Sequence, residues 1–134
     1  MSSGGGFLME PARFPGRAPI DAYGNGGFRF ADMSHRGSIL VLPSAIEAWT
    51  VNTPDEVTVA SIGRLLDEAA SIEILLVGTG PSLALLPTDV TAALRAAGLE
   101  PDLMATGAAV RTFNVLLSEG RQVAAALIAV ETNR

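Results

Sequence analysis

The amino-acid sequence lacks several residue types on which common enzyme chemistry depends. Its 134 residues include no cysteine, no lysine and a single histidine, His35. Without cysteine the chain forms no disulfide, thiol nucleophile or Cys-zinc site, and with one histidine it cannot build a multi-histidine metal site by itself. The absence of lysine excludes a P-loop lysine, a Schiff-base lysine and a Ser–Lys dyad. Most enzyme classes are therefore excluded before any motif is considered.

Aromatic and charged residues are also scarce, at 5% and 17%, whereas 49% of the residues are hydrophobic. This composition excludes long disordered regions, and the length suits one domain with a real core. The net charge of −5 makes nucleic acid an unfavourable partner. The longest uninterrupted apolar run, residues 123–130, is far shorter than the ~20 residues that span a bilayer. Because the first residues also lack an apolar signal core, we expect a soluble, cytoplasmic protein of bacterial type.

The N-terminal half is organised around turns and alternating apolar residues. Residues 1–18 are rich in glycine, proline and arginine, which predicts a flexible tail or a surface strap without regular structure, ahead of a single domain over 19–134. Between residues 20 and 51 apolar and polar residues alternate, and the G-N-G-G run at 24–27 is typical of a hairpin turn. This half therefore predicts an antiparallel meander.

Helices and apolar strands alternate in the C-terminal half. Helices are predicted at 59–69, 88–97 and 106–119, and strands at 72–77, 99–105 and 122–130. The predicted N-caps are Thr58, Thr88 and Thr106, and the predicted C-terminal stops are Gly98 and Gly120. Strands that alternate with helices indicate a largely parallel sheet covered by helices, an α/β architecture.

The first candidate site is the loop Gly78-Thr79-Gly80-Pro81, which follows the apolar strand predicted at 72–77. Glycines at the carboxyl end of a strand let a backbone approach a ligand, and open α/β sheets bind ligands at that edge. A dinucleotide fingerprint would need a third glycine, where this chain has leucine, and a helix directly after it. The loop is therefore more typical of a tight turn than of a nucleotide site, and it is compatible with a pocket wall.

The second candidate site is one face of the helix predicted at 106–119. Arg111 and Asn114 lie three residues apart and share that face, and a guanidinium beside an amide can grip a carboxylate or a phosphate. The same side chains can instead hold backbone carbonyls of a neighbouring loop, which is the commoner role in an alanine-rich helix. Glu119 and Arg121, beyond this face, would form a local ion pair or contribute charge to the same pocket.

The single histidine is a weak candidate for catalysis. His35 directly follows Ser34 in a predicted turn, and adjacent residues are poorly placed to act as nucleophile and base on one element. We expect His35 to lie in a solvent-exposed loop.

Several segments of the sequence carry a resemblance to a known family. They are L-V-G-T-G at 76–80, M-A-T-G-A-A at 104–109, R-T-F-N-V-L at 111–116 and E-G-R at 119–121. Over residues 19–130 the chain resembles a small uncharacterised family that includes the human mitochondrial complex I assembly factor three and the adipogenesis-associated domain protein. The resemblance implies a compact three-layer α/β fold with a mixed central sheet and an additional N-terminal antiparallel β-layer. It implies no established reaction.

The recurrent polar positions of this family fall on six residues of the chain: Thr79, Thr106, Arg111, Asn114, Glu119 and Arg121. Two positions depart from the family pattern, since Ala105 stands where an acidic residue is common and Val110 where relatives often have cysteine. The first departure argues against a mechanism that needs a carboxylate there. The second argues against thiol chemistry as an essential property of the family.

Three interpretations of these residues follow. The missing catalytic groups and the resemblance favour a non-enzymatic protein-interaction module, an assembly or chaperone-like factor for a membrane-associated respiratory complex, whose protein partner the sequence does not identify. The alternative is a small-molecule or anion-binding pocket, sensing or catalytic, lined by Gly78, Thr79, Gly80, Thr106, Arg111, Asn114, Glu119 and Arg121. In the third interpretation all of these residues serve the fold. We expect no cofactor and no metal, and a homo-oligomer is compatible with the sequence.

Overall fold

A computed structural model of the chain describes residues 13–133. The strands are β1 (Arg13–Pro15), β2 (Ile20–Gly24), β3 (Gly27–Phe30), β4 (Met33–Arg36), β5 (Ser38–Val41), β6 (Ala45–Trp49), β7 (Ile74–Gly78), β8 (Pro101–Met104) and β9 (Val123–Leu127). The α-helices are α1 (Gly63–Asp67), α2 (Thr88–Ala96) and α3 (Thr106–Ser118), and short 3-10 turns lie at Pro54–Glu56, Ala60–Ile62 and Ala69–Ser71.

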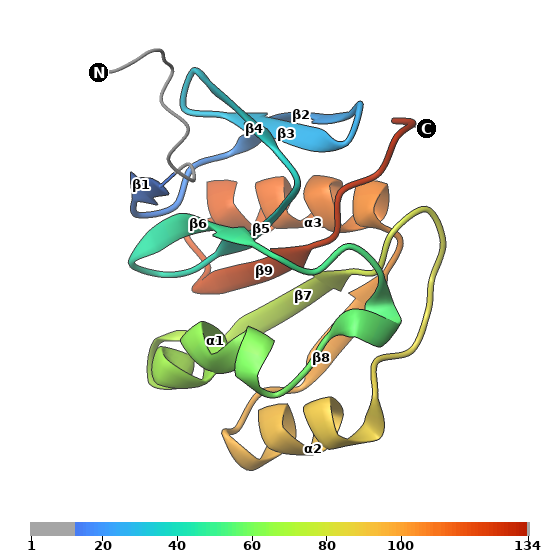
Figure 1. Cartoon of the computed structure of the whole chain (residues 1–134). Coiled ribbons are helices and arrows are strands. Elements are labelled where there is room, and N and C mark those ends of the chain that lie inside the picture. Colours follow the sequence, from blue (N-terminus) through green and yellow to red (C-terminus); the bar gives the residue numbers. More distant parts are fainter. Residues whose placement is uncertain (1–12, 134) are drawn as a thin grey trace, which may run out of the picture.

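The strands form two sheets, and these confirm the expected α/β class. The central sheet has six strands in the order β1-β6-β5-β9-β7-β8, and β2-β3-β4 form a separate antiparallel sheet. In the central sheet β7 pairs in parallel with both β8 and β9, whereas β5 pairs antiparallel with β9. The central sheet is therefore mixed. The small sheet and α3 lie on one side of it and α1 and α2 on the other, which gives three layers (Figure 1).

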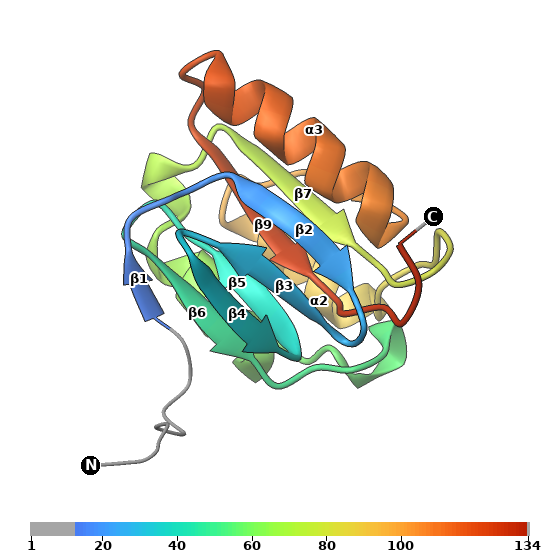
Figure 2. The same ribbon diagram turned by 90° about the horizontal axis from the view of Figure 1, so that it is seen from above.

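The small sheet and α3 share one hydrophobic core. Phe28 and Phe30 point from β3 onto the central sheet and are at most 2% exposed, while Phe113 of α3 is fully buried in the same cluster. Seen from above, β2 is the strand of the small sheet that lies nearest to α3 (Figure 2). The small sheet is the additional β-layer that the resemblance implies, and the meander predicted for residues 20–51 is divided between the two sheets.

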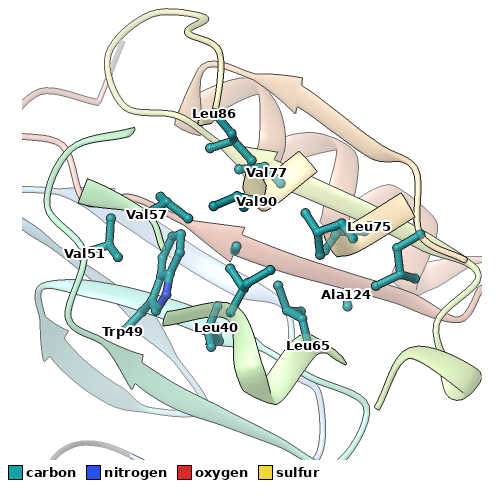
Figure 3. Close-up of a cluster of buried hydrophobic side chains, with 14 of the residues drawn as sticks. Leu40, Trp49, Val51, Val57, Leu65, Leu75, Val77, Leu86, Val90 and Ala124 are labelled. Carbon is teal, nitrogen blue, oxygen red and sulfur yellow. The ribbon is translucent and has the colours of Figure 1, made fainter. Parts of the chain in front are cut away.

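A second core fills the space between the central sheet and the α1 and α2 side. It is built from β5, β7 and β9 together with α1, α2 and the segments around them (Figure 3). Trp49 lies in this cluster at 5% exposed, and its indole nitrogen donates a hydrogen bond of 2.8 Å to the carbonyl of Ser61. Burial of the ring therefore leaves no unpaired donor.

The predicted hairpin turn and the two predicted helix C-terminal stops are confirmed. Asn25 and Gly26 both have positive φ, as a two-residue type I′ hairpin turn requires. Gly98 and Gly120 each end a helix in the left-handed conformation, with 6→1 bonds from Leu99 N to Leu94 O and from Arg121 N to Leu116 O. Thr58 accepts a bond from the amide of Ser61, but the N-cap position of the short turn there is Val59, so Thr58 is not the N-cap that was predicted.

Three local predictions are wrong. Residues 13–15 form β1 against β6, so proline and glycine do not exclude regular structure there; residues 1–12 lie outside the described part of the chain. The helix predicted at 59–69 is broken into short turns around α1, since Ile62 leaves helical values just before Gly63, a poor helix former. Thr88 and Thr106 are first residues of their helices and do not cap them; the N-cap positions are Pro87 and Ala105.

Candidate functional site

Thr79 is a structural anchor for the loop after β7. Its side chain is buried, with its hydroxyl 2.8 Å from the carbonyl of Ser82 and 3.2 Å from that of Met104. The same hydroxyl accepts a bond of 3.0 Å from the amide of Ala84. The single proton of this hydroxyl and one of its two lone pairs are therefore engaged by the backbone, so the side chain holds the loop.

Thr106 joins three elements at the start of α3. Its side chain is fully buried, and its hydroxyl donates to the carbonyl of Ile128 at 2.7 Å and accepts from the amide of Gly80 at 3.0 Å. The backbone amide of Thr106 donates in turn to the carbonyl of Gly80. This use of the hydroxyl explains why Thr106 does not cap its helix.

The two glycines of the loop have different roles. A Cβ on Gly78 would lie 2.9 Å from the Cα of Thr106, so this glycine lets β7 approach the start of α3. Gly80 has φ +111 and open space around it, so its requirement is conformational. Of the two, Gly80 is the one that lines a surface cleft.

Asn114 holds the first strand of the small sheet. Its Oδ1 accepts a bond of 2.9 Å from the amide of Ile20, and its Nδ2 donates one of 2.9 Å to the carbonyl of the same residue. The side chain thus pairs with one residue of β2 as a neighbouring strand would. The oxygen and the nitrogen of the side-chain amide are both bonded within the fold, which is the structural role predicted as the commoner one for this helix face.

Arg111 is exposed, and its guanidinium has one hydrogen bond in the described structure, a 3.3 Å contact from Nη1 to the hydroxyl of Tyr23. Together with Gly80 and the first turn of α3 these side chains line a cleft of about 90 Å³. A Cβ on Gly107 would lie 2.5 Å from the hydroxyl of Tyr23, so this glycine makes room for the ring. Tyr23 was not predicted as a site residue, since only the fold brings β2 to α3.

Glu119 and Arg121 lie at the opposite end of α3 from this cleft. Ten residues separate Arg121 from Arg111, which corresponds to roughly 15 Å along a helix. Arg121 forms an ion pair with Glu73 at 2.8 Å and thereby lowers the pKa of that carboxyl group. The eight predicted site residues therefore do not converge on one pocket, and only Gly80 and Arg111 line the cleft.

The single histidine lies in the small antiparallel sheet. His35 lies in β4 and is half-buried, so the expectation of an exposed loop is wrong. Its Nε2 is 3.3 Å from the carbonyl of Ser38, and burial lowers the pKa of the ring. Across residues 13–133, no group of three or more His, Cys, Asp or Glu could hold a metal ion. No helix in the same range is long and apolar enough to cross a membrane.

An apolar loop between β7 and α2 was not singled out from the sequence. Leu83 and Leu85 are 64% and 82% exposed, whereas Leu86 beside them is buried. The hydroxyl of Thr79 fixes the start of this loop through the amide of Ala84. The run of leucines was visible in the sequence, but which of them turn outward depends on the tertiary contacts of the loop.

The arrangement of sheets and helices defines the class of protein as a mixed α/β domain of the Mth938-like type. A Bordetella pertussis protein described as a Mth938-like domain superposes with a TM-score of 0.73 at 27% identity, over 84% of this chain and 85% of its own. The chain belongs to the family described as "Protein of unknown function (DUF498/DUF598)", whose model matches residues 20–128.

Similar proteins support this assignment. An uncharacterized protein of Rhodobacter capsulatus is 40% identical over 89% of this chain and 90% of its own length. The mouse NADH dehydrogenase [ubiquinone] 1 alpha subcomplex assembly factor 3 is 33% identical over 87% of this chain, which spans 63% of that protein. A crystal structure of a Bartonella henselae protein described as an outer membrane protein has a TM-score of 0.84 at 58% identity, over 88% of this chain and 99% of that one.

Proposed function

We propose that this chain is a non-enzymatic protein-interaction module that acts in the assembly of a membrane-associated respiratory complex. The observation that carries the proposal is its similarity to relatives named as assembly factor 3 of NADH dehydrogenase, at 33% identity in mouse and 34% in human. The hydrogen bonds of the predicted site residues support the proposal. The side chains of Thr79, Thr106 and Asn114 bond to backbone groups of the same chain. A cytoplasmic location is part of the same proposal.

The contact surface that we propose for the partner is the apolar loop that carries Leu83 and Leu85. Full burial of one leucine side chain contributes about 1.5–3 kcal/mol. Burial of both exposed leucines against a partner would therefore contribute substantially to the free energy of binding. The hydrogen bond from Ala84 to Thr79 and the buried Leu86 hold the loop in place. A loop already ordered loses little conformational entropy when it binds, which favours an apolar groove on a protein partner.

Affinity purification tests this proposal. The tagged chain at native expression level is compared with a Leu83→Ser/Leu85→Ser variant, and co-eluting proteins are identified by mass spectrometry. Val115→Ser is the matched control, because Val115 is also exposed, at 55%, but lies on α3. We expect a subunit or another assembly factor of the respiratory complex to elute with the wild type and the control but not with the loop variant. An identical set of proteins from all three would refute the loop as the contact.

One observation favours a second function, the binding of a small anion at the cleft beside Tyr23. Arg111 is exposed and forms no ion pair within residues 13–133, although a guanidinium binds carboxylate or phosphate well. Melting temperatures in phosphate and citrate, compared with chloride at equal ionic strength, test it. A rise in the wild type that is absent in Arg111→Gln would support this site, and equal melting of both proteins in all buffers would exclude it.

A further inference from the structure

The arginines within residues 13–133 fall into three groups by their partners. Between residues 13 and 133, ion pairs with carboxylates are formed by Arg13, Arg64, Arg95 and Arg121. Arg17 donates to the carbonyl of Val123 and to the side chain of Gln122. The remaining three, Arg29, Arg36 and Arg111, have no carboxylate at ion-pair distance in this range. Two of these lie on the same small sheet.

The strand register brings Arg29 and Arg36 to one face. Across the small sheet, Ala22 pairs with Arg29, which pairs with Ser34. In the adjacent row that shares this face, Gly24 pairs with Gly27, which pairs with Arg36. The intervening residues, such as Phe28, point to the core. The outer face therefore carries two arginines on a floor of alanine, serine and glycine.

This floor is hollowed, because its small residues leave space between the two long side chains. A depression of about 560 Å³ is lined by both arginines and by the residues of this floor. Arg29 is oriented along the floor by a 3.2 Å bond from its Nη1 to the hydroxyl of Ser34. Tyr23 lines both this depression and the cleft beside Arg111, so the two basic sites adjoin.

Within residues 13–133, no acidic group lies at ion-pair distance from either arginine of this face. Asp21, Asp32 and Glu131 are exposed residues on or beside the small sheet, and none forms an ion pair with either arginine. Glu131 lies beside Arg36, since its Oε2 and the Nη1 of Arg36 would be 3.2 and 3.7 Å from a Cβ on Gly26, and it offsets part of the charge of that arginine without pairing with it. On a chain with a net charge of −5, a face with two unpaired arginines attracts a partner of opposite charge.

We propose that the outer face of β2, β3 and β4 binds an extended acidic segment of a protein partner, with its carboxylates on Arg29 and Arg36. Guanidinium groups bind carboxylates through paired donors. The depression is partly open to solvent and lies on a sheet surface, whereas small-molecule sites enclose most of their ligand. The proposal rests on the proposed function for the partner being a protein, and it adds a second contact to the apolar loop.

A titration followed by nuclear magnetic resonance tests the acidic-segment proposal directly. The probe is a ten-residue peptide of alternating glutamate and alanine, added to the ¹⁵N-labelled chain at low salt. Amide shifts are expected in residues 22–36 and are expected to shrink as salt screens the charges. The same peptide with glutamine in place of glutamate should cause none. Shifts confined to other elements, equal shifts with the glutamine peptide, or no shifts at all would overturn the proposal.

Matched charge variants separate this face from the overall charge of the protein. Arg29→Gln/Arg36→Gln removes two charges from the face, and Arg13→Gln/Arg95→Gln removes two from arginines whose side chains are 59% exposed elsewhere. We expect the first variant to bind the peptide about three- to tenfold more weakly and the second to change less than twofold. Equal weakening in both variants would overturn the proposal, as would retained binding in the first.

The failure of this inference is distinguishable from the failure of the proposed function. If Arg29→Gln/Arg36→Gln keeps the co-purifying proteins that Leu83→Ser/Leu85→Ser loses, the interaction module stands and the acidic segment is refuted. Binding to vesicles of phosphatidylglycerol tests the alternative that this face binds an anionic membrane. Arginine-dependent sedimentation with these vesicles, without shifts from the peptide, would assign the face to an anionic membrane and overturn the proposal.

Discussion

Asn114→Ala is the substitution that most sharply separates a structural role from a ligand-binding role on α3. It removes the two 2.9 Å hydrogen bonds that join the side-chain amide to the amide and carbonyl of Ile20. Ile20 is 2% exposed and both bonds are partly buried, so water reaches the backbone groups that lose their partners only in part. The substitution therefore weakens the contact between β2 and α3 and leaves no replacement for it.

The expected cost follows from the number of orphaned groups. A buried donor or acceptor left without a partner costs about 1–3 kcal/mol, so two such groups that water reaches in part cost about 2–4 kcal/mol. An unfolding entropy of about 2.1 cal/mol/K per residue gives about 0.28 kcal/mol/K for 134 residues. Asn114→Ala should therefore lower the melting temperature by about 7–14 °C.

Thermal and urea unfolding followed by circular dichroism at 222 nm measure this loss. Val115→Ala is the control on the next residue of α3, and because Val115 is 55% exposed it should change the free energy of unfolding by less than about 0.5 kcal/mol. If Asn114→Ala is as stable as this control, the structural assignment of Asn114 is refuted, and the ligand-binding interpretation of this face regains its main residue.

Three further predictions concern Thr106, the glycines and His35. Thr106→Val should destabilise the chain by about 2–3 kcal/mol, because its buried hydroxyl serves two backbone groups, and Thr106→Ser should recover most of this in urea unfolding. Gly27→Ala should lower the melting temperature, because its Cβ would collide with the carbonyl oxygen of His35, whereas Gly63→Ala, with open space, should not. Burial lowers the pKa of His35 in the folded chain, so the imidazole of His35 binds a proton more tightly in the unfolded chain than in the folded one. Stability should fall as pH drops below about 6.5, and His35→Gln should reduce that fall between pH 7.5 and 5.5. If His35→Gln leaves the pH dependence of the free energy of unfolding unchanged, the lowered pKa of His35 is contradicted.

Turns and helix ends that need a left-handed residue were predicted from the sequence, whereas the N-caps at Thr88 and Thr106 and the continuous helix at 59–69 were predicted wrongly. The hairpin turn at Asn25 and Gly26 and the helix ends at Gly98 and Gly120 require a left-handed backbone, and the residues that adopt it are few. The alternation of helices and strands in the second half likewise predicts the parallel pairing of β7 with β8 and β9.

Features that depend on distant partners were not predicted. Asn114 and Ile20 are 94 residues apart, and the sequence does not show that their groups meet. The hydroxyl of Thr106 could cap a helix or bond a neighbouring strand, and only the position of Ile128 favours the second. The outward direction of Arg29 follows from the hairpin register, but its lack of a carboxylate partner is a property of the folded surface.

The central claim, a role in assembling a respiratory complex, is tested most directly by deleting the gene in its own organism. Assembled NADH dehydrogenase is then measured by native gel electrophoresis, with total subunit levels measured in parallel. We predict that the assembled complex falls while its subunits are still synthesised, and that the wild-type chain restores it but Leu83→Ser/Leu85→Ser does not. Unchanged amounts of assembled complex in the deletion strain would contradict the account.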